Sequence, residues 1–245
     1  MDTFSIPSQF CGPPFSSNGG YFCGMVASFF DYPVEIRLKA PPPLNTPMQI
    51  HRGEVQAQVF SDDKLIAQVR PCTEPCEPAP YISMEDAAQC SDAGLKGSLI
   101  NHPFPGCFVC GPERSEGDGM MVFTGPKAGT PLYGAKWHAH GAWSSNGTEI
   151  DPHYVWSALD CPSSGPAFAT SVEAQSNIAY VLGTLSIQIK QLPKVGNDYV
   201  IVCATDENHE RRYRTRVSLY ASDQSLLASG SAVWIQVPRS LFQNA

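Results

Sequence analysis

The stretch Ser61-Asp62-Asp63-Lys64-Leu65-Ile66-Ala67 returns in the second half of the chain as Ser222-Asp223-Gln224-Ser225-Leu226-Leu227-Ala228. A second pair of similar stretches, Val34–Lys39 and Leu185–Lys190, lies upstream of the two copies, and both are rich in strand-forming residues. The spacing between the copies is too long for a short-period solenoid. The sequence therefore predicts an internal duplication, in which each half of the chain contributes similar strands.

Two apolar stretches upstream of these strands predict helices. Gly19–Phe30 carries small and apolar residues on all sides, as expected of a helix surrounded by a sheet, and it follows Asn18. The second stretch runs from Pro152 to about Asp160. One copy thus holds a glycine turn and the other holds a carboxylate. This split predicts one composite site between the two halves.

The remaining pattern predicts antiparallel strands, because polar and apolar residues alternate or β-branched residues cluster between turn signals. Pro71 to about Pro105 is rich in Pro and Cys and is interpreted as a linker, whereas about 162–180 is interpreted as an insertion. We divide the chain into an N-terminal unit with its linker, 1–98, and a C-terminal unit, 99–245. The expected strands lie near 34–40, 48–60, 64–70, 120–123, 132–138, 184–192, 198–205, 211–221 and 225–237.

Composition and charge restrict the class of protein. The chain has 245 residues, of which 42% are hydrophobic and 16% charged, so it can bury a substantial core. The net charge of −7 argues against nucleic acid and anionic membranes as partners. The one basic cluster is favoured as a solvated strand face, and a local patch for a polyanionic cofactor is the alternative; it comprises Arg211, Arg212, Arg214 and Arg216.

The nine cysteines are interpreted mostly as small buried residues in a reducing compartment. Met1–Phe10 has no basic segment followed by an apolar core, so we expect no targeting segment and a cytoplasmic location. Cys107 and Cys110 have the spacing of zinc ligands, with His102, His138 and His140 as candidate partners. No second pair of this spacing exists, so we expect no metal. We interpret Cys161, beside Asp160, as a buried thiol rather than a nucleophile.

One helix followed by antiparallel strands, twice over, resembles the hotdog fold, and the fusion of two copies resembles the double-hotdog acyl-CoA thioesterases. Single-unit relatives read His-Gly-Gly, six residues, then Asp on the central helix. Asn18-Gly19-Gly20 matches the first part, but Ala27 stands where the acid belongs. In the second copy Asp160 matches the acid, but Asp151-Pro152-His153 replaces the glycine turn. Cys107–Pro112 resembles a Cys-rich lead-in found in some of these proteins. The resemblance implies an α+β fold of two tandem hotdog units, each a curved antiparallel sheet wrapped around a central helix.

The resemblance also implies the chemistry, which is hydrolysis of an acyl thioester. Asp160 would act as general base or nucleophile, and the amides of Gly19 and Gly20 would hold the oxyanion at a helix N-terminus. Asn18 would cap and orient that helix, while Thr184 would lie on the strand after the acid-bearing helix, near the attacking water. The pocket for the acyl group is expected between the helices and lined by Tyr21, Met25 and Trp156. The copy that pairs Ala27 with Asp151 is expected to be inert.

Two other functions remain open. Hotdog dehydratases use a histidine and an acid from opposite units, and His153 lies on the correct helix. The other open function is that of a non-catalytic acyl-CoA-binding protein. Thioesterases of the thioesterase II family use a glutamine on the last strand, and this chain has Ala232 near that position, so the glutamine is missing. The expected partner is a small acyl thioester, and coenzyme A would belong to the substrate rather than act as a cofactor. A homo-oligomer of the whole chain also stays open.

Overall fold

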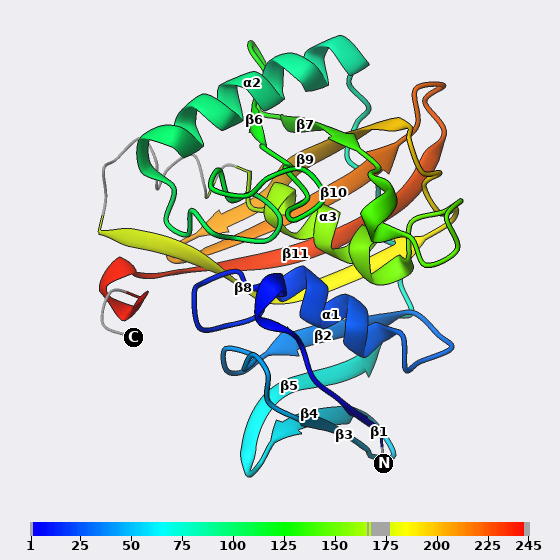
Figure 1. The fold of residues 1–245 in the computed structure, drawn as a ribbon, viewed down its shortest axis with the longest axis vertical. Helices are drawn as coiled ribbons and strands as arrows, with labels where there is room; N and C mark the ends of the chain where they lie inside the picture. The colour runs from blue at the N-terminus through cyan, green and yellow to red at the C-terminus, as the bar shows by residue number, and fades with distance from the viewer. Residues whose placement is uncertain (1, 166, 168–176, 243–245) are drawn as a thin grey trace.

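The computed structural model describes residues 2–165, 167 and 177–242. Its described strands form one eleven-stranded sheet in the order β1-β3-β4-β5-β2-β8-β11-β10-β9-β7-β6 (Figure 1). The strands of the first half are β1 (Asp2–Phe4), β2 (Val34–Leu38), β3 (Met48–Arg52), β4 (Ala57–Ser61) and β5 (Lys64–Pro71). Those of the second half are β6 (Gly125–Pro126), β7 (Tyr133–His138), β8 (Ile178–Ile189), β9 (Asp198–His209), β10 (Arg212–Tyr220) and β11 (Leu226–Pro238).

Three α-helices and three short 3₁₀ turns accompany the sheet in the described part of the chain. The helices are α1 (Gly19–Ala27), α2 (Met84–Asn101) and α3 (Pro152–Ser163). The 3₁₀ turns are η1 (Ser8–Phe10), η2 (Gly141–Trp143) and η3 (Arg239–Phe242). The α+β class expected from the sequence is confirmed.

The two halves of the sheet join through antiparallel pairing of β2 with β8. Glu35 pairs with Ser186, Ile36 with Leu185 and Arg37 with Thr184. All of these residues except Thr184, which directly precedes Leu185, belong to the two similar stretches noted in the sequence, so the repeated elements pair with each other. The pairing covers two strand edges that would otherwise be exposed. It makes the sheet continuous through both halves of the chain.

Helices α1 and α3 pack against each other at very close range, because glycines of α1 face α3. A Cβ atom at Gly24 would lie 2.6 Å from the Cα atom of His153, and one at Gly20 would lie 2.7 Å from the carbonyl oxygen of Trp156. Only glycine fits at such distances, so these two glycines allow the close packing of the helices. The close packing sets the N-terminus of α1 against the C-terminal half of α3.

Helix α2 is the main departure from the expected organisation. The segment 71–105 was expected to be a linker, but most of it is this helix, which covers β6 and β7. Its buried positions hold the small side chains Ala87, Cys90, Gly94 and Ser98, so no run of large apolar residues marks it. The side chain of Ser83 caps it by accepting a hydrogen bond from the amide of Asp86. The proposed boundary between residues 98 and 99 falls inside α2.

The central part of β9 is buried on both faces, because α2 and α3 lie on opposite sides of the sheet. Val200, Val202 and Ala204 join the small cluster beneath α2, whereas Tyr199 and Ile201 join the main core around α1 and α3. The continuous apolar run in β9 is therefore explained by the layers that cover both faces of this antiparallel strand. The main core lies between the sheet and the α1–α3 pair.

Several element boundaries differ from the sequence predictions. Helix α1 ends at Ala27 rather than Phe30, and α3 continues to Ser163 with Pro162 inside it. The stretch 48–60 is two strands, and residues 120–123 form no strand. Most of the expected insertion at 162–180 lies outside the described residues.

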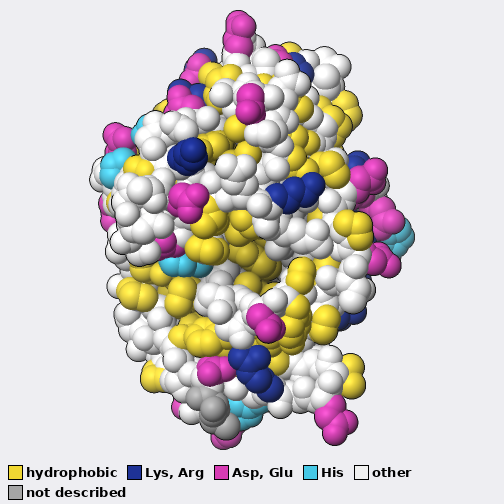
Figure 2. Space-filling model, turned by 90° about the vertical axis from the view of Figure 1, so that its right-hand side faces the viewer, with side chains coloured by type: hydrophobic (Ala, Val, Ile, Leu, Met, Phe, Trp, Pro, Cys, Tyr) yellow, Lys and Arg dark blue, Asp and Glu magenta, His cyan; other side chains and the backbone are white. Residues whose placement is uncertain are grey.

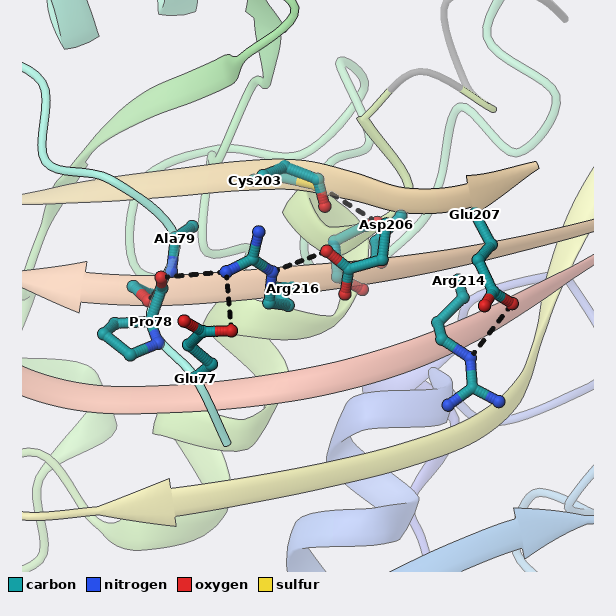
Figure 3. Close-up of polar contacts among 12 residues, drawn as sticks. Glu77, Pro78, Ala79, Cys203, Asp206, Glu207, Arg214 and Arg216 are labelled. Carbon is teal, nitrogen blue, oxygen red and sulfur yellow. Dashed lines mark hydrogen bonds and ion pairs between the residues drawn. The ribbon is translucent and has the colours of Figure 1, made fainter. Parts of the chain in front are cut away.

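Segment 72–82, which we call the crossing segment, runs over the sheet face away from α3. The hydroxyl of Ser218 accepts a hydrogen bond from the Ala79 amide, and the Tyr220 hydroxyl donates to the Ala79 carbonyl. Arg216 forms an ion pair with Asp206 at 2.6 Å. It also contacts Glu77 and the carbonyl of Pro78, as Figure 3 shows. Arg216 therefore fixes the crossing segment. Among the described residues, no helix is long and apolar enough to cross a membrane.

Candidate active site

The carboxylate of Asp160 lies against the N-terminus of α1, although 140 positions separate it from Gly20 in the sequence. Its Oδ2 atom accepts a hydrogen bond from the Gly20 amide at 2.8 Å and a second from the Asn18 side-chain Nδ2 at 3.0 Å. Its Oδ1 atom is buried and has no hydrogen-bond partner among the described residues. One oxygen is thus held in place, while the other remains available.

Burial dominates the ionisation of Asp160, whose side chain is 2% exposed. Desolvation raises the pKa of Asp160 to about 7, against the opposing effects of the hydrogen bonds from Gly20 and Asn18. Electrostatic repulsion from the neighbouring Cys107 raises the pKa further. A carboxyl group whose pKa lies near neutrality can both accept and return a proton at neutral pH.

The side-chain amide of Asn18 acts both as a hydrogen-bond acceptor and as a hydrogen-bond donor. Its Oδ1 caps α1 by accepting a hydrogen bond from the Tyr21 amide at 2.9 Å, while its Nδ2 donates to Asp160. Because the two ends of one amide group are fixed by the helix and the acid, Asn18 sets their relative position. The expectation that Asn18 caps this helix is confirmed.

The two glycine amides differ in their availability. The Gly20 amide already donates to Asp160 and is not free to hold an oxyanion in this arrangement. The Gly19 amide makes no hydrogen bond within the described residues, and Gly19 lines the cavity beside Asp160. The N-terminus of α1 thus offers one unengaged donor, from Gly19, where the sequence predicted two.

A cavity of about 540 Å³ opens beside Asp160, Asn18 and Gly19. Its walls are mostly apolar and come from the segment before α1, from the Phe104–Cys110 loop, from β8 and from the end of the chain. Prominent lining side chains are Phe15, Phe104, Tyr180, Leu182, Trp234 and Phe242. An apolar cavity with a few convergent polar groups is typical of a small-molecule site.

The cavity reaches the place where the two halves of the sheet separate. β2 pairs with β8 only through Glu35–Arg37, and beyond this point Leu38–Pro42 and Tyr180–Gly183 both line the cavity. An open cleft of about 810 Å³ on the sheet shares four lining residues with the cavity, which are Leu38, Lys39, Gly183 and Ile235. The two spaces therefore adjoin.

The cleft is rich in cationic side chains. Arg214 faces Glu207 at 3.7 Å, as Figure 3 also shows, and Arg70 pairs with Glu35 at 2.7 Å. Five cations line it in total: Arg37, Lys39, Arg70, Arg212 and Arg214. Within the described residues, three of these five have no ion pair, namely Arg37, Lys39 and Arg212. Part of the basic cluster seen in the sequence thus lines a hollow rather than an evenly solvated strand face.

Four residues that the sequence assigned to the site lie elsewhere. Thr184 lines the basic cleft and is absent from the cavity wall, because the β-bulge near Gly183 turns it to the other face. Tyr21 stacks on Phe10 at 4.0 Å between ring centroids, inside the core. Met25 packs on the same core. The pocket lies at the N-terminal end of α1, not along the helix pair, and its wall therefore excludes these residues.

The fourth residue, Trp156, belongs to the opposite end of the α1–α3 pair. Figure 2 views the side toward which the C-terminal end of α1 points, and apolar side chains gather around a hollow there. Ala27 and Trp156 line a depression of about 510 Å³, whose wall contains no carboxylate among the described residues. His153 is absent from that wall and packs edge-on against Tyr21 instead.

Three cysteines, of which the sequence connected only two, converge beside Asp160. The Sγ atoms of Cys107, Cys110 and Cys161 lie within 4.8 Å of one another, and all three residues line the cavity. His102 lines it too, and its Nδ1 accepts a hydrogen bond from the Phe104 amide. Spacing identified Cys107 and Cys110 as a pair, but nothing local to Cys161 indicated that α3 brings it to them.

Comparison with known proteins shows the fold. No family model matches the chain, and the search of curated proteins gave no match. A protein of Novosphingobium aromaticivorans assigned as a thioesterase aligns with a TM-score of 0.58 at 10% identity over 95% of this chain and 94% of its own. The dehydratase domain of a mycocerosic acid synthase-like polyketide synthase aligns with a TM-score of 0.60 at 11% identity over 96% and 90%.

A third solved structure carries the name of the fold. A protein with a hot dog fold from Alicyclobacillus acidocaldarius aligns with a TM-score of 0.52 at 9% identity, over 96% of this chain and 92% of its own. This chain has the hotdog fold. Because each of these alignments covers nearly the whole of both chains, the likeness extends through both halves of the sheet.

Proposed function

We propose that this chain consists of two tandem hotdog units and hydrolyses an acyl thioester at one composite site between them. The observation that carries the proposal is the buried Asp160 carboxylate, held through one oxygen by Gly20 and Asn18 and lining an apolar cavity. The acid comes from one half of the chain and the helix N-terminus from the other. The hotdog fold supports the proposal, and one of the similar structures is assigned as a thioesterase.

The proposed reaction uses Asp160 as general base in its ionised form. The carboxylate removes a proton from a water molecule, whose oxygen forms a bond to the thioester carbonyl carbon. The negative charge that develops on the carbonyl oxygen is stabilised by the Gly19 amide and by the positive end of the α1 dipole. The carbon–sulfur bond then breaks, and the departing thiolate takes the proton from Asp160.

Direct attack by the Asp160 carboxylate is the alternative course. It would form an anhydride with release of the thiolate, and water would then hydrolyse that anhydride. The unpaired Oδ1 is compatible with both courses. Hydrolysis in ¹⁸O-labelled water under single-turnover conditions separates them. Only in the anhydride course can water attack the Asp160 carbonyl carbon, which leaves solvent ¹⁸O on Asp160 and an unlabelled Asp160 oxygen in the product acid.

The positive charge of the cleft favours a substrate whose acyl group is attached to an anionic carrier. Arg37, Lys39 and Arg212 line it without an ion pair in the described structure, and it adjoins the cavity at Lys39. In coenzyme A the reactive sulfur is separated from several phosphate charges by an extended, uncharged arm that contains two amide groups. An acyl-CoA would therefore place its thioester at Asp160 and its phosphates among these cations, where Arg and Lys bind them strongly. Coenzyme A is then part of the substrate, and hydrolysis by Asp160 requires no cofactor.

The test is release of free thiol from a panel of acyl-CoA esters of different length. The wild-type chain should release thiol from at least one ester, and Asp160→Asn should lose that activity while keeping the circular dichroism spectrum of the wild type. Asp151→Asn, at the other end of α3, is the matched control and should retain activity. Turnover in Asp160→Asn at a rate close to that of the wild type would exclude the proposed site.

A second candidate is hydration of an enoyl thioester or its reverse, dehydration. Burial lowers the pKa of His102 to about 4, so this histidine is neutral near pH 7, and it lines the cavity together with Asp160. The histidine that the sequence suggested, His153, does not line it. An enoyl-CoA hydration assay with wild type and His102→Ala tests this candidate. Tight binding of acyl-CoA without either reaction would favour the non-catalytic binder.

A further inference from the structure

A compact group of three thiols forms one wall of the cavity. Cys107 and Cys110 come from the loop after α2, and Cys161 follows Asp160 on α3. The Cys107 and Cys161 sulfur atoms are 3.8 Å apart, and all three sulfurs lie within 4.8 Å of one another. No described cysteine forms a disulfide. We call these three residues the thiol cluster.

The sulfur spacing fits the coordination of zinc. Zinc–thiolate bonds of about 2.3 Å in a tetrahedral arrangement place neighbouring sulfurs about 3.8 Å apart. The Cys107–Cys161 distance already has this value, and the remaining sulfurs need shifts of at most about 1 Å. A disulfide would instead require one pair to approach to about 2.05 Å and would leave the third thiol unused.

The backbone of the loop positions two of the thiols before any ion binds. The Gly111 amide donates to the Cys107 carbonyl at 2.9 Å, which closes a tight turn around Cys107–Cys110. A Cβ atom at Gly111 would collide with that carbonyl and with the carbonyl of Pro105, so only glycine fits there.

We propose that Cys107, Cys110 and Cys161 bind one zinc ion, whose fourth position faces the cavity. Cys110 and Cys161 are only partly buried and line the cavity, so an ion has a route to the cluster. Thiolate ligands select zinc and other soft ions over magnesium and calcium. The expectation of no metal rested on the absence of a second Cys-x-x-Cys pair, and the fold supplies a third ligand from α3 instead. The inference does not depend on thioester hydrolysis.

The test is a titration of the reduced, metal-free full chain with Co²⁺, which takes the place of zinc and reports its ligands by absorption. We expect one Co²⁺ per chain, a sulfur-to-cobalt charge-transfer band in the near ultraviolet, and displacement of that band by one equivalent of Zn²⁺. Cys161→Ser should weaken binding by about tenfold or more and reduce the band. Cys76→Ser, a partly buried thiol on the crossing segment, is the matched control and should leave both unchanged.

A second measurement keeps the test valid if Cys161→Ser fails to fold. In the wild-type chain, Zn²⁺ should protect these three cysteines from alkylation, with Cys72 and Cys76 modified at the same rate with or without the ion. Each modified peptide is measured by mass spectrometry. Binding without the sulfur band is an adventitious ion only and would overturn the proposal. Equal alkylation of the thiol cluster with and without saturating Zn²⁺ would also overturn it.

Discussion

The two ends of the α1–α3 pair have the same helical framework but different chemistry. At one end, the N-terminus of α1 meets Asp160 of α3 and opens into the apolar cavity. At the other end, the N-terminus of α3 meets the last turn of α1, where Ala27 stands in place of an acid. Pro152 opens α3 and lacks the amide hydrogen that Gly19 offers. The acid and the amide donor are therefore both missing from the second end.

The caps of the two helices show the same contrast. Asn18 caps α1 through its side chain and also donates to the acid, whereas Asp151 makes no capping hydrogen bond to α3. Its Oδ1 instead accepts hydrogen bonds from the amide and hydroxyl of Ser145. Asp151 thus fastens a loop. The comparison teaches that the same pair of packed helices carries different side chains and different free amides at its two ends.

The largest expected effect comes from removing the acid at the first end. Asp160→Asn keeps the shape and an oxygen that accepts from Gly20, but it cannot accept a proton. We expect kcat to fall by about 10²–10⁴-fold, the usual contribution of a general base. Thiol release from the best acyl-CoA ester measures it. The control variant Asp151→Asn should change kcat by less than about twofold. Similar losses of kcat in both variants would remove the distinction between the two ends.

The next effect comes from crowding the free amide. A Cβ atom at Gly19 would lie 2.7 Å from the Leu182 Cδ2 atom and 3.5 Å from Asp160 Oδ2, so Gly19→Val fills the space for the carbonyl group. We expect kcat/KM to fall by about 10–100-fold, comparable to the loss of one oxyanion donor. Ala27→Val, at the other end, is the control. If both variants lose activity equally, the Gly19 amide has no special role.

The pH dependence sharpens the assignment of Asp160. Its pKa is raised to about 7, and the proposed base is the ionised form. The rate should therefore fall by about tenfold for each pH unit below 7 and level off above it. Stability should change in the opposite direction, because a raised carboxyl pKa means that the folded chain binds more protons than the unfolded chain between about pH 4 and 7.

This second consequence is measured by urea unfolding at several pH values. The free energy of unfolding of the wild type should decrease as pH rises toward 7, relative to Asp160→Asn, by up to roughly 4 kcal/mol. A rate that increases as pH falls below 7 would contradict the role of Asp160 as base.

The smallest expected effect concerns the helix caps. Asn18→Ala removes a capping acceptor and should lower the free energy of unfolding by about 1 kcal/mol. It also removes a donor to Asp160, so kcat should fall as well. Asp151→Ala removes no capping bond from α3 and should leave kcat unchanged. Chemical denaturation measures the free energy of unfolding, and thiol release measures kcat. If Asn18→Ala and Asp151→Ala lose equal kcat, Asn18 acts only through stability.

Several features of this protein followed from local sequence alone. Asn18-Gly19-Gly20 predicted a capped helix start, because a side-chain acceptor followed by glycines suits that position. The two similar stretches around Ile36 and Ile187 predicted equivalent strands, since alternation is a local signal. Asp160 was identified because it completes a pattern split between the halves. Each of these inferences used residues close together in the chain or a repeat between them.

The linker between the halves shows where local signals fail. Helix α2 buries small residues such as Ala87 and Gly94, so its sequence lacks the apolar periodicity of an amphipathic helix. The acyl pocket was expected along Tyr21 and Met25, but those side chains pack in the core. Whether an apolar side chain lines a cavity or fills a core depends on its neighbours in space, and composition does not encode them.

The sequence by itself determined the fold class, the start of α1 and the acid that faces it, because propensity and capping act over short distances and the repeat relates the two halves of the chain. Tertiary structure decided what the groups do once assembled. In the folded chain the Gly20 amide donates to Asp160, and the Gly19 amide is left without a partner among the described residues. Thr184 lies on the opposite face, and Cys161 lies beside Cys107 and Cys110. These outcomes depend on the register of β8 and the close crossing of α1 and α3, which contacts between distant residues fix.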